Sequence, residues 1–347
     1  MKISAATLQL LVQSIFAAAG CKTVEAETIA RRLVDANLVG HDSHGAIRVP
    51  SYIQWMNSGK VLPGQSIQTV VDNDALAIVD GQFGFGQVIG AQAMELAIRK
   101  SRKSGIAVVG LRNCGHLGRI GDWAEMAAAA GCVSLHFVNT TGAGILVAPH
   151  GGYEPRLSAN PLAAGVPRKN APPIILDMST CIIAEGKIQV ALNTNQQVAE
   201  GCVLDANGRP TTDPRAFYGP PRGAILPFGA HKGYGLGVIA EVLAGALTAG
   251  SCSNPSATRL ANNMLSIVFD PTCIQNAETF HGEMERFIEY VKSSRTVAPN
   301  GEILLPGELE ARNRAHRLVS GIELDKTTWE NLERVAGETG ARVQFDN

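Results

Sequence analysis

Between residues 75 and 177, short stretches rich in β-branched residues alternate with longer stretches of helical periodicity. Buried strands read as short continuous apolar runs, whereas a helix needs ten or more residues with an apolar stripe. The pattern predicts strands over 75–80, 106–111, 133–138 and 174–177, and helices over 87–101 and 123–130. Such alternation is typical of an α/β sheet covered by helices.

Helices predominate on both sides of this segment. The stripe Leu8, Leu11, Val12, Ile15 and Phe16, preceded by Ser4 as a cap, favours an amphipathic helix over 4–18 rather than a secretion signal. We also expect a strand over 264–269, a turn-rich loop over 205–223, and helices over 24–39, 51–56, 234–248, 309–321 and 327–337. Helix 234–248 is expected to be buried, and the apolar faces of 4–18 and 309–337 to be exposed and available to a second copy.

Composition excludes several classes of protein. The 30 Lys and Arg balance 31 Asp and Glu, so a nucleic-acid groove or an anionic membrane surface is not expected. Seven dispersed cysteines without a Cys-x-x-Cys pair indicate reduced thiols in a cytoplasmic protein. No uncharged apolar run reaches the ~18 residues of a membrane span. The 37 glycines indicate many tight turns and close backbone approaches.

The sequence Gly84-x-Gly86-x-x-x-Gly90 follows a predicted strand and opens a predicted helix, as a dinucleotide-binding turn does. Its spacing is one residue too long, and the next strand ends in Arg112-Asn113 where an NAD site needs an acid. We therefore expect a structural turn here.

The polar segment 41–48 contains the groups that reduction of a 2-oxo acid needs. His44 could supply a proton, Arg48 could bind a carboxylate with two hydrogen bonds, and Ser43 could hydrogen-bond either group. Two other interpretations stay open: His44 caps the preceding helix while Arg48 forms a surface pair, or His41, Asp42 and His44 bind a metal.

Two further histidines lie in glycine-rich turns next to predicted helices. Gly115-His116-Leu117-Gly118-Arg119 and His231-Lys232-Gly233-Tyr234-Gly235 both suit an anion or phosphate at a helix N-terminus. The first is equally compatible with a glycine-rich turn whose histidine is merely exposed, and the second does not by itself predict a phosphate site.

Together these segments resemble a known family. The sequence contains, in order, ANLVGHDSHGAIRVPSY, GHLGRIGDWAE, SANPLAAGVPR, ILDMST with EGK, PFGAHKGYGL with EVLAGAL, and ILLPGE. This series is similar to the malate/L-lactate/sulfolactate/ureidoglycolate dehydrogenase family of NAD(P)-dependent oxidoreductases, and it covers nearly the whole chain. Ala230, where many members have glycine, and Cys181 depart from the pattern and leave the substrate open.

The resemblance implies an α/β fold of the sulfolactate dehydrogenase type, distinct from the Rossmann fold, and a homodimer. It implies a helical substrate and dimer region over 1–70 and 300–347, a connecting α/β segment over 71–115, and a mixed-sheet NAD(P) domain over 116–299. His44 and His116 match catalytic positions, and Ser43, Arg48 and Tyr52 match substrate-binding positions. Cofactor-binding positions are matched by Gly118, Arg119, Ile120, Asp177, Met178, Ser179, Thr180, Lys232, Asn262, Leu305, Pro306, Gly307 and Glu308.

The expected activity is a cytoplasmic, NAD- or NADP-dependent interconversion of a 2-hydroxy acid and a 2-oxo acid, with no metal. Reduction of a cyclic imino acid by the same groups is the nearest alternative. A metal-dependent hydrolase or lyase built on His41, His44 and His116, or an inactive small-molecule binder, remains a more distant one.

Overall fold

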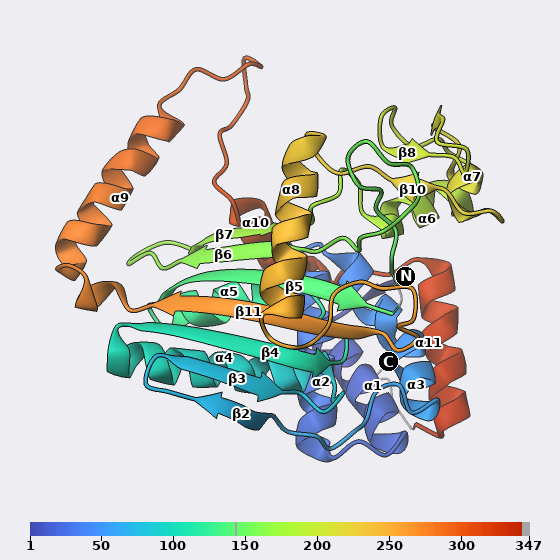
Figure 1. The fold of residues 1–347 in the computed structure, drawn as a ribbon, viewed down its shortest axis with the longest axis horizontal. Coiled ribbons are helices and arrows are strands. Elements are labelled where there is room, and N and C mark those ends of the chain that lie inside the picture. The colour runs from blue at the N-terminus through green and yellow to red at the C-terminus, as the bar shows by residue number, and fades with distance from the viewer. Residues whose placement is uncertain (143, 342–347) are drawn as a thin grey trace.

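The computed structural model describes residues 1–142 and 144–341, and at its centre is a seven-stranded sheet in the order β2-β3-β4-β11-β5-β6-β7 (Figure 1). Among the described strands, β3 and β4 pair in parallel and the other neighbours pair antiparallel. The sheet is therefore mixed, unlike the parallel sheet of a doubly wound nucleotide-binding fold. The strands are β2 Gln68–Asp72, β3 Leu76–Asp80, β4 Ile106–Cys114, β5 Val133–Thr141, β6 Leu162–Val166, β7 Ile174–Met178 and β11 Ala261–Phe269.

Helices cover the two faces of this sheet unequally. Helices α4 (Gly86–Ser104) and α5 (Gly121–Ala129) pack behind it, where Met94 and Trp123 are fully buried. The opposite face carries α8 (His231–Ala240), which continues as the π-helix η3 (Glu241–Ala246) and lies across β5 and β11 (Figure 1). The four strands and both helices predicted between residues 75 and 177 are confirmed, as is the strand predicted over 264–269, whereas sequence reasoning missed β2 and β6.

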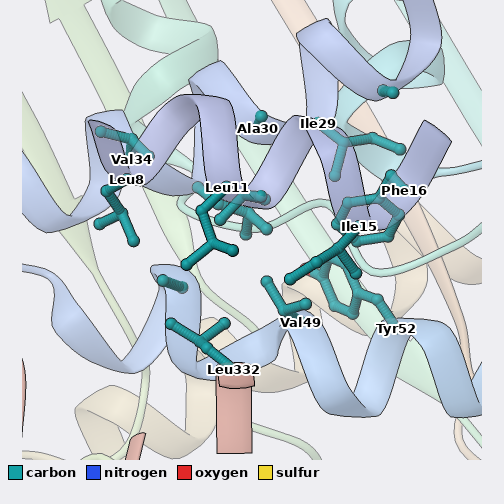
Figure 2. Close-up of a cluster of buried hydrophobic side chains, with 14 of the residues drawn as sticks. Leu8, Leu11, Ile15, Phe16, Ile29, Ala30, Val34, Val49, Tyr52 and Leu332 are labelled. Atoms are coloured by element: carbon teal, nitrogen blue, oxygen red, sulfur yellow. The ribbon is translucent and has the colours of Figure 1, made fainter. Parts of the chain in front are cut away.

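A helical layer joins the two ends of the chain. Helices α1 (Ala5–Ala18), α2 (Thr23–Leu38), α3 (Val49–Asn57) and α11 (Lys326–Thr339) enclose one apolar core, to which Leu8, Phe16, Tyr52 and Leu332 all contribute (Figure 2). Strands β1 (Lys2–Ile3) and β12 (Ile322–Glu323) pair antiparallel beside it. Ser4 caps α1 through the backbone N–H of Thr7, as predicted.

This core corrects one prediction. The apolar stripes of α1 and α11 are buried against each other within one chain, because the termini meet, so they are not available to a second copy. Helix α10 (Glu308–Ser320) instead exposes Leu309, Leu318 and Val319. Residues 342–347 of the predicted C-terminal region lie outside the described residues.

A third, small core lies above the helical layer around Ile188, Phe217 and Ile225 (Figure 1). It is built from α6 (Glu185–Asn193), α7 (Pro214–Tyr218), β8 (Val203–Leu204), β9 (Pro210–Thr211) and β10 (Ala224–Ile225). The predicted loop 205–223 supplies two of these short elements. Helix α9 (Ala277–Lys292), which sequence reasoning missed, projects away from the sheet.

The helix predicted over 234–248 is correct in type but wrong in burial. It begins at His231, and Ile239, Val242 and Leu247 on its outer side are 48%, 49% and 60% exposed. Apolar residues lie on all sides of this helix, a pattern that predicts a buried helix. In the structure, only one side of the helix packs on the sheet of this chain. All seven cysteines are free thiols. None of the described helices is long and apolar enough to cross a membrane.

Candidate active site

The segment 41–48 forms two short 3₁₀ turns, η1 (Asp42–His44) and η2 (Ala46–Arg48), which the end of α2 holds in place. The Asn37 side chain accepts a hydrogen bond from the backbone N–H of Ala46 at 2.8 Å and donates one to Asp42 at 2.6 Å. A Cβ at Gly45 would collide with the Asn37 amide, so only glycine fits there. From α10, Arg317 pairs with the same Asp42 carboxylate at 2.7 Å. The turns are thus fixed by residues on two distant helices.

His44 and Arg48 leave these turns toward the same place. The His44 Nδ1 lies 3.0 Å from the Ser43 hydroxyl, and Arg48 donates its Nε–H to the Ser43 carbonyl oxygen at 2.6 Å. The two terminal nitrogens of Arg48 form no ion pair with the described residues. Burial, then the Arg48 charge and the neighbouring His116, lower the pKa of His44 well below its usual value.

His116 joins this group from the loop after β4. Its ring stacks on His44 with the centroids 5.6 Å apart and the planes 15° apart. Its Nδ1 lies 2.7 Å from the hydroxyl of Tyr52, and the Gln87 amide nitrogen lies 3.0 Å from the same hydroxyl. Burial and the Arg48 charge lower the pKa of His116 to about 3, while burial raises the pKa of Tyr52 to about 12. Both side chains are therefore neutral near pH 7.

The structure thus brings together all five residues predicted for catalysis and substrate binding. Asn262, predicted to contact the cofactor, lies beside them: its Oδ1 accepts a hydrogen bond from the Leu117 N–H at 2.8 Å and so holds the His116 loop. Sequence reasoning missed Gln87 and Asn37. Gln87 carries no local signal, because it acts on Tyr52, 35 residues away. Asn37 acts on Asp42 and Ala46 just beyond its own helix, but a single asparagine at a helix end does not reveal these contacts.

The other predicted cofactor residues gather around β7 and the turn that follows it. Asp177 accepts a hydrogen bond from the Gly121 N–H at 3.0 Å, Thr180 accepts one from Phe228 at 3.1 Å, and the Ile175 N–H donates to the Pro306 carbonyl at 3.0 Å. Strand β7 and the turn after it therefore contact all the other predicted cofactor segments, which are 118–121, 227–233 and 305–308.

Arg119 and Asp177 are committed to other protein groups. The Arg119 side chain is fully buried and pairs with Asp122 at 3.0 Å, with Glu125 at 2.8 Å and with Asp177 at 3.5 Å. Burial, opposed by the Arg119 charge, raises the pKa of Asp177 and that of Asp122, the latter to about 7. The segment is buried, and Gly118 in it lies in the left-handed region at φ +74°.

A cavity of about 520 Å³ lies between β7, α5 and α10. Pro173, Ile175 and Gly307 line it together with Glu125, Arg168 and Arg314. Arg168 pairs with Glu285 and Arg314 with Asp35, so the cavity has apolar walls and a rim of paired charges. Lys232, at the first turn of α8, is exposed and forms no ion pair with the described residues. An apolar hollow beside a glycine loop and a free cation at a helix N-terminus are features that fit an extended dinucleotide.

The turn at Gly84 and Gly86 is structural, as expected. Gly86 packs so closely on the His116 backbone that a Cβ there would collide with the His116 carbonyl oxygen, so the glycine is needed for packing within the chain. The metal interpretation finds no support either. His41 faces Asp177 at 4.0 Å and Glu310 at 3.5 Å rather than His44, and residues 1–142 and 144–341 contain no group of three ligands that could hold a metal ion.

Comparison with known proteins decides the family. A family model described as malate/L-lactate dehydrogenase matches residues 3–333. The chain belongs to the malate/L-lactate dehydrogenase family. Among the relatives of this family member is hydroxycarboxylate dehydrogenase B of Escherichia coli strain K12, which is 39% identical over 98% of this chain and 94% of that enzyme. The resemblance stated from the motifs is therefore confirmed.

Two other members mark the range of the family. The structure of sulfolactate dehydrogenase from Methanocaldococcus jannaschii superimposes with a TM-score of 0.86 at 35% identity and covers 98% of both chains, which confirms the expected fold class. A Δ1-pyrroline-2-carboxylate/Δ1-piperideine-2-carboxylate reductase of Pseudomonas putida is 35% identical over 95% of each chain. The family member described here is thus an oxidoreductase from a family that acts on small molecules.

Proposed function

We propose that this dehydrogenase interconverts a small 2-hydroxy acid and its 2-oxo acid with NAD or NADP. The observation that carries the proposal is the Arg48 guanidinium beside the stacked His44 and His116 rings. Because its Nε–H is held by the Ser43 carbonyl, the two terminal nitrogens are oriented and free to bind a carboxylate in a bidentate manner. A carboxylate bound there would place the adjacent C2 oxygen within reach of the imidazoles.

His44 is the proposed proton donor and acceptor. As a neutral imidazole it can take the hydroxyl proton of a 2-hydroxy acid. The Arg48 charge is the second cause of its low pKa, so a substrate carboxylate that neutralises Arg48 raises the pKa of His44. Binding of the substrate and uptake of the catalytic proton are therefore coupled. His116, by hydrogen bonding to the same oxygen, would stabilise its developing charge.

The bound nicotinamide cofactor would supply or accept the hydride at C2 of the acid. Three segments, one lysine and one asparagine would hold the cofactor. They are the backbone of Gly118, Arg119 and Ile120, the turn Asp177, Met178, Ser179 and Thr180, the loop Leu305, Pro306, Gly307 and Glu308, Lys232, and Asn262. The cavity beside Gly307 suits its adenine end, since proline, isoleucine and alanine side chains form the walls. The helical layer then carries the substrate contacts, and the sheet carries the cofactor contacts.

The test is to follow the absorbance of NADH and of NADPH against a panel of 2-oxo acids and cyclic imines, with and without EDTA. We expect oxidation of the reduced cofactor with at least one 2-oxo acid and no effect of EDTA. Reduction of cyclic imines alone would favour the second candidate, which the similarity to the Pseudomonas putida reductase supports. Loss of activity with EDTA would favour a metal enzyme.

We further propose that the protein is a homodimer that covers the outer side of α8. Ile239, Val242 and Leu247 on that helix are exposed together with Leu135 of β5 and Leu176 of β7 on the sheet. Exposed apolar residues gathered in one region mark protein–protein contacts. Light scattering should give a mass near twice 36.6 kDa, and Val242→Glu should shift it to the monomer, whereas Val319→Glu on α10 should not. A wild-type monomer at all concentrations would contradict the proposal.

A further inference from the structure

Gln87, at the first turn of α4, forms no hydrogen bond with either histidine ring among the described residues. Its side chain is 1% exposed. The amide nitrogen donates to the Tyr52 hydroxyl at 3.0 Å and to the backbone carbonyl of His116 at 3.3 Å. The amide oxygen, Oε1, makes no hydrogen bond within the described residues. A backbone carbonyl can only accept, so the amide nitrogen, not the oxygen, must face it. The orientation of the Gln87 amide is therefore fixed.

This orientation decides the direction of the Tyr52 hydroxyl. Gln87 donates to the Tyr52 oxygen, so the Tyr52 proton must find an acceptor elsewhere. The hydroxyl has one other partner within the described residues, His116 Nδ1 at 2.7 Å. Tyr52 is 2% exposed, and an unpaired buried O–H group would cost free energy. Tyr52 therefore donates to His116 Nδ1.

His116 in turn has only one neutral tautomer that accepts at Nδ1. The Nδ1 lone pair receives the Tyr52 proton in a hydrogen bond, so the ring's own proton is on Nε2. Nε2 has no hydrogen-bond partner within the described residues and belongs to the ring that stacks on His44. The ring thus presents a donor, not a lone pair, to an oxygen bound at the site.

We propose that Gln87 is a positioning residue for the reaction: it orients the Tyr52 hydroxyl and thereby fixes His116 as the Nε2–H tautomer that donates to the substrate oxygen. The value of this tautomer for catalysis rests on the proposed function, whereas the tautomer itself does not. The lowered pKa of His116, about 3, keeps the ring neutral over the working range, so the choice of tautomer matters. Gln87 also holds the His116 loop through its second hydrogen bond.

The experiment compares Gln87→Glu with Gln87→Met. An ionised Glu can only accept, so Tyr52 would turn its proton toward it, and His116 would have to carry its proton on Nδ1 to bond the Tyr52 oxygen. Met keeps the length but donates nothing, so both tautomers become accessible. Gln92→Glu is the matched control, because Gln92 lies on the same helix and accepts from the Ile67 N–H, a role that Glu retains.

The first measurement is the ¹⁵N spectrum of histidine-labelled enzyme, with His116→Asn to assign the signal. We expect Nε2–H in the wild type and in Gln92→Glu, Nδ1–H in Gln87→Glu above the pKa of the new carboxyl group, and a mixture in Gln87→Met. A wild-type ring protonated on Nδ1, or a Gln87→Met ring that is wholly Nε2–H, overturns the proposal. This measurement needs no turnover, so it stands apart from any failure of the proposed activity.

The second measurement is the pH profile of 2-oxo acid reduction. We expect kcat of Gln87→Glu to fall about tenfold or more at high pH, with KM nearly unchanged, and to recover as falling pH protonates the new carboxyl group into a donor. A merely structural role would lower activity equally at every pH. That flat profile, or unchanged kcat in both Gln87 variants, would overturn the catalytic part of the proposal.

Discussion

The interior of the sheet and the edge of the helical layer each hold a histidine whose pKa burial lowers to about 3. In the sheet, His136 on β5 uses both ring nitrogens, each 2.9 Å from a serine hydroxyl, those of Ser266 and Ser134. At the edge of the helical layer, His116 uses Nδ1 for Tyr52 and keeps Nε2 for a ligand. A lowered pKa therefore does not distinguish a structural histidine from a candidate catalytic one, whereas an unused nitrogen beside an unpaired arginine does.

The largest expected effect is a loss of activity when a histidine of the site, but not the histidine of the sheet, is replaced. His44→Asn should lower kcat for 2-oxo acid reduction by roughly 10²–10⁴-fold, because it removes a positioned proton donor. Binding of NADH, followed by its fluorescence, should change little. His136→Asn should keep most of the activity of whatever fraction folds. If instead His116→Asn causes the large loss while His44→Asn keeps more than about a tenth of the activity, the roles of the two histidines are exchanged.

The next effect concerns the cofactor side of the same region. Lys232→Ala should weaken NADH or NADPH binding by about ten- to hundredfold, which is the usual effect of losing a hydrogen bond to a charged group. Lys60→Ala, at another exposed lysine that forms no ion pair with the described residues, serves as the control. Fluorescence titration measures both, and equal affinities would contradict the placement of the cofactor.

Gly86→Ala is not a neutral comparison for that titration. A purely structural turn predicts that this variant, if it folds, binds NADH nearly normally. The structure shows that the new Cβ would collide with the His116 carbonyl oxygen, so we expect the substitution to displace His116 or to impair folding. This expectation depends on the contact between Gly86 and His116, which are thirty positions apart in the sequence.

A smaller effect is expected at the carboxylate site. Arg48→Lys retains the charge but loses the planar pair of donors, so kcat/KM for a 2-oxo acid should fall by about an order of magnitude or more. An aldehyde analogue without the carboxylate should lose much less. Arg112→Lys, whose partner Asp80 lies 2.8 Å away on the neighbouring strand β3, is the control. Equal losses for acid and aldehyde would mean that Arg48 is structural.

The smallest effect is a pH dependence of stability that belongs to His136. Its pKa is lower in the folded protein than in the unfolded chain, so below about pH 6.5 the unfolded chain binds more protons and stability falls with falling pH. One such group contributes a slope of up to about 1.4 kcal/mol per pH unit. The measurement is urea unfolding between about pH 5 and 7, a range that includes the unperturbed histidine pKa. In His136→Asn the free energy of unfolding should change less steeply with pH than in the wild type. Equal slopes would contradict the burial argument.

Periodicity and capping were enough to predict most of the fold. Apolar stripes such as Leu8 to Phe16 repeat at helical spacing, and the β-branched runs at 106–111 and 133–138 read directly as strands. Sequence reasoning did not predict the strongly charged α9 or the exposed β2, because neither carries the continuous apolar run that marks a buried element. The burial of α8 was misjudged for the converse reason, since composition does not reveal which face has a neighbour.

The sequence by itself determined the element types, the family motifs and the residues that could do chemistry, because these depend on local order along the chain. The tertiary structure decided what those residues are free to do. It commits the Arg119 side chain to three carboxylates, and it leaves the ends of Arg48 open. It also joins Tyr52, Gln87 and His116 into one chain of hydrogen bonds. The direction of a hydrogen bond depends on every donor and acceptor around it, and here those groups come from three separate parts of the sequence.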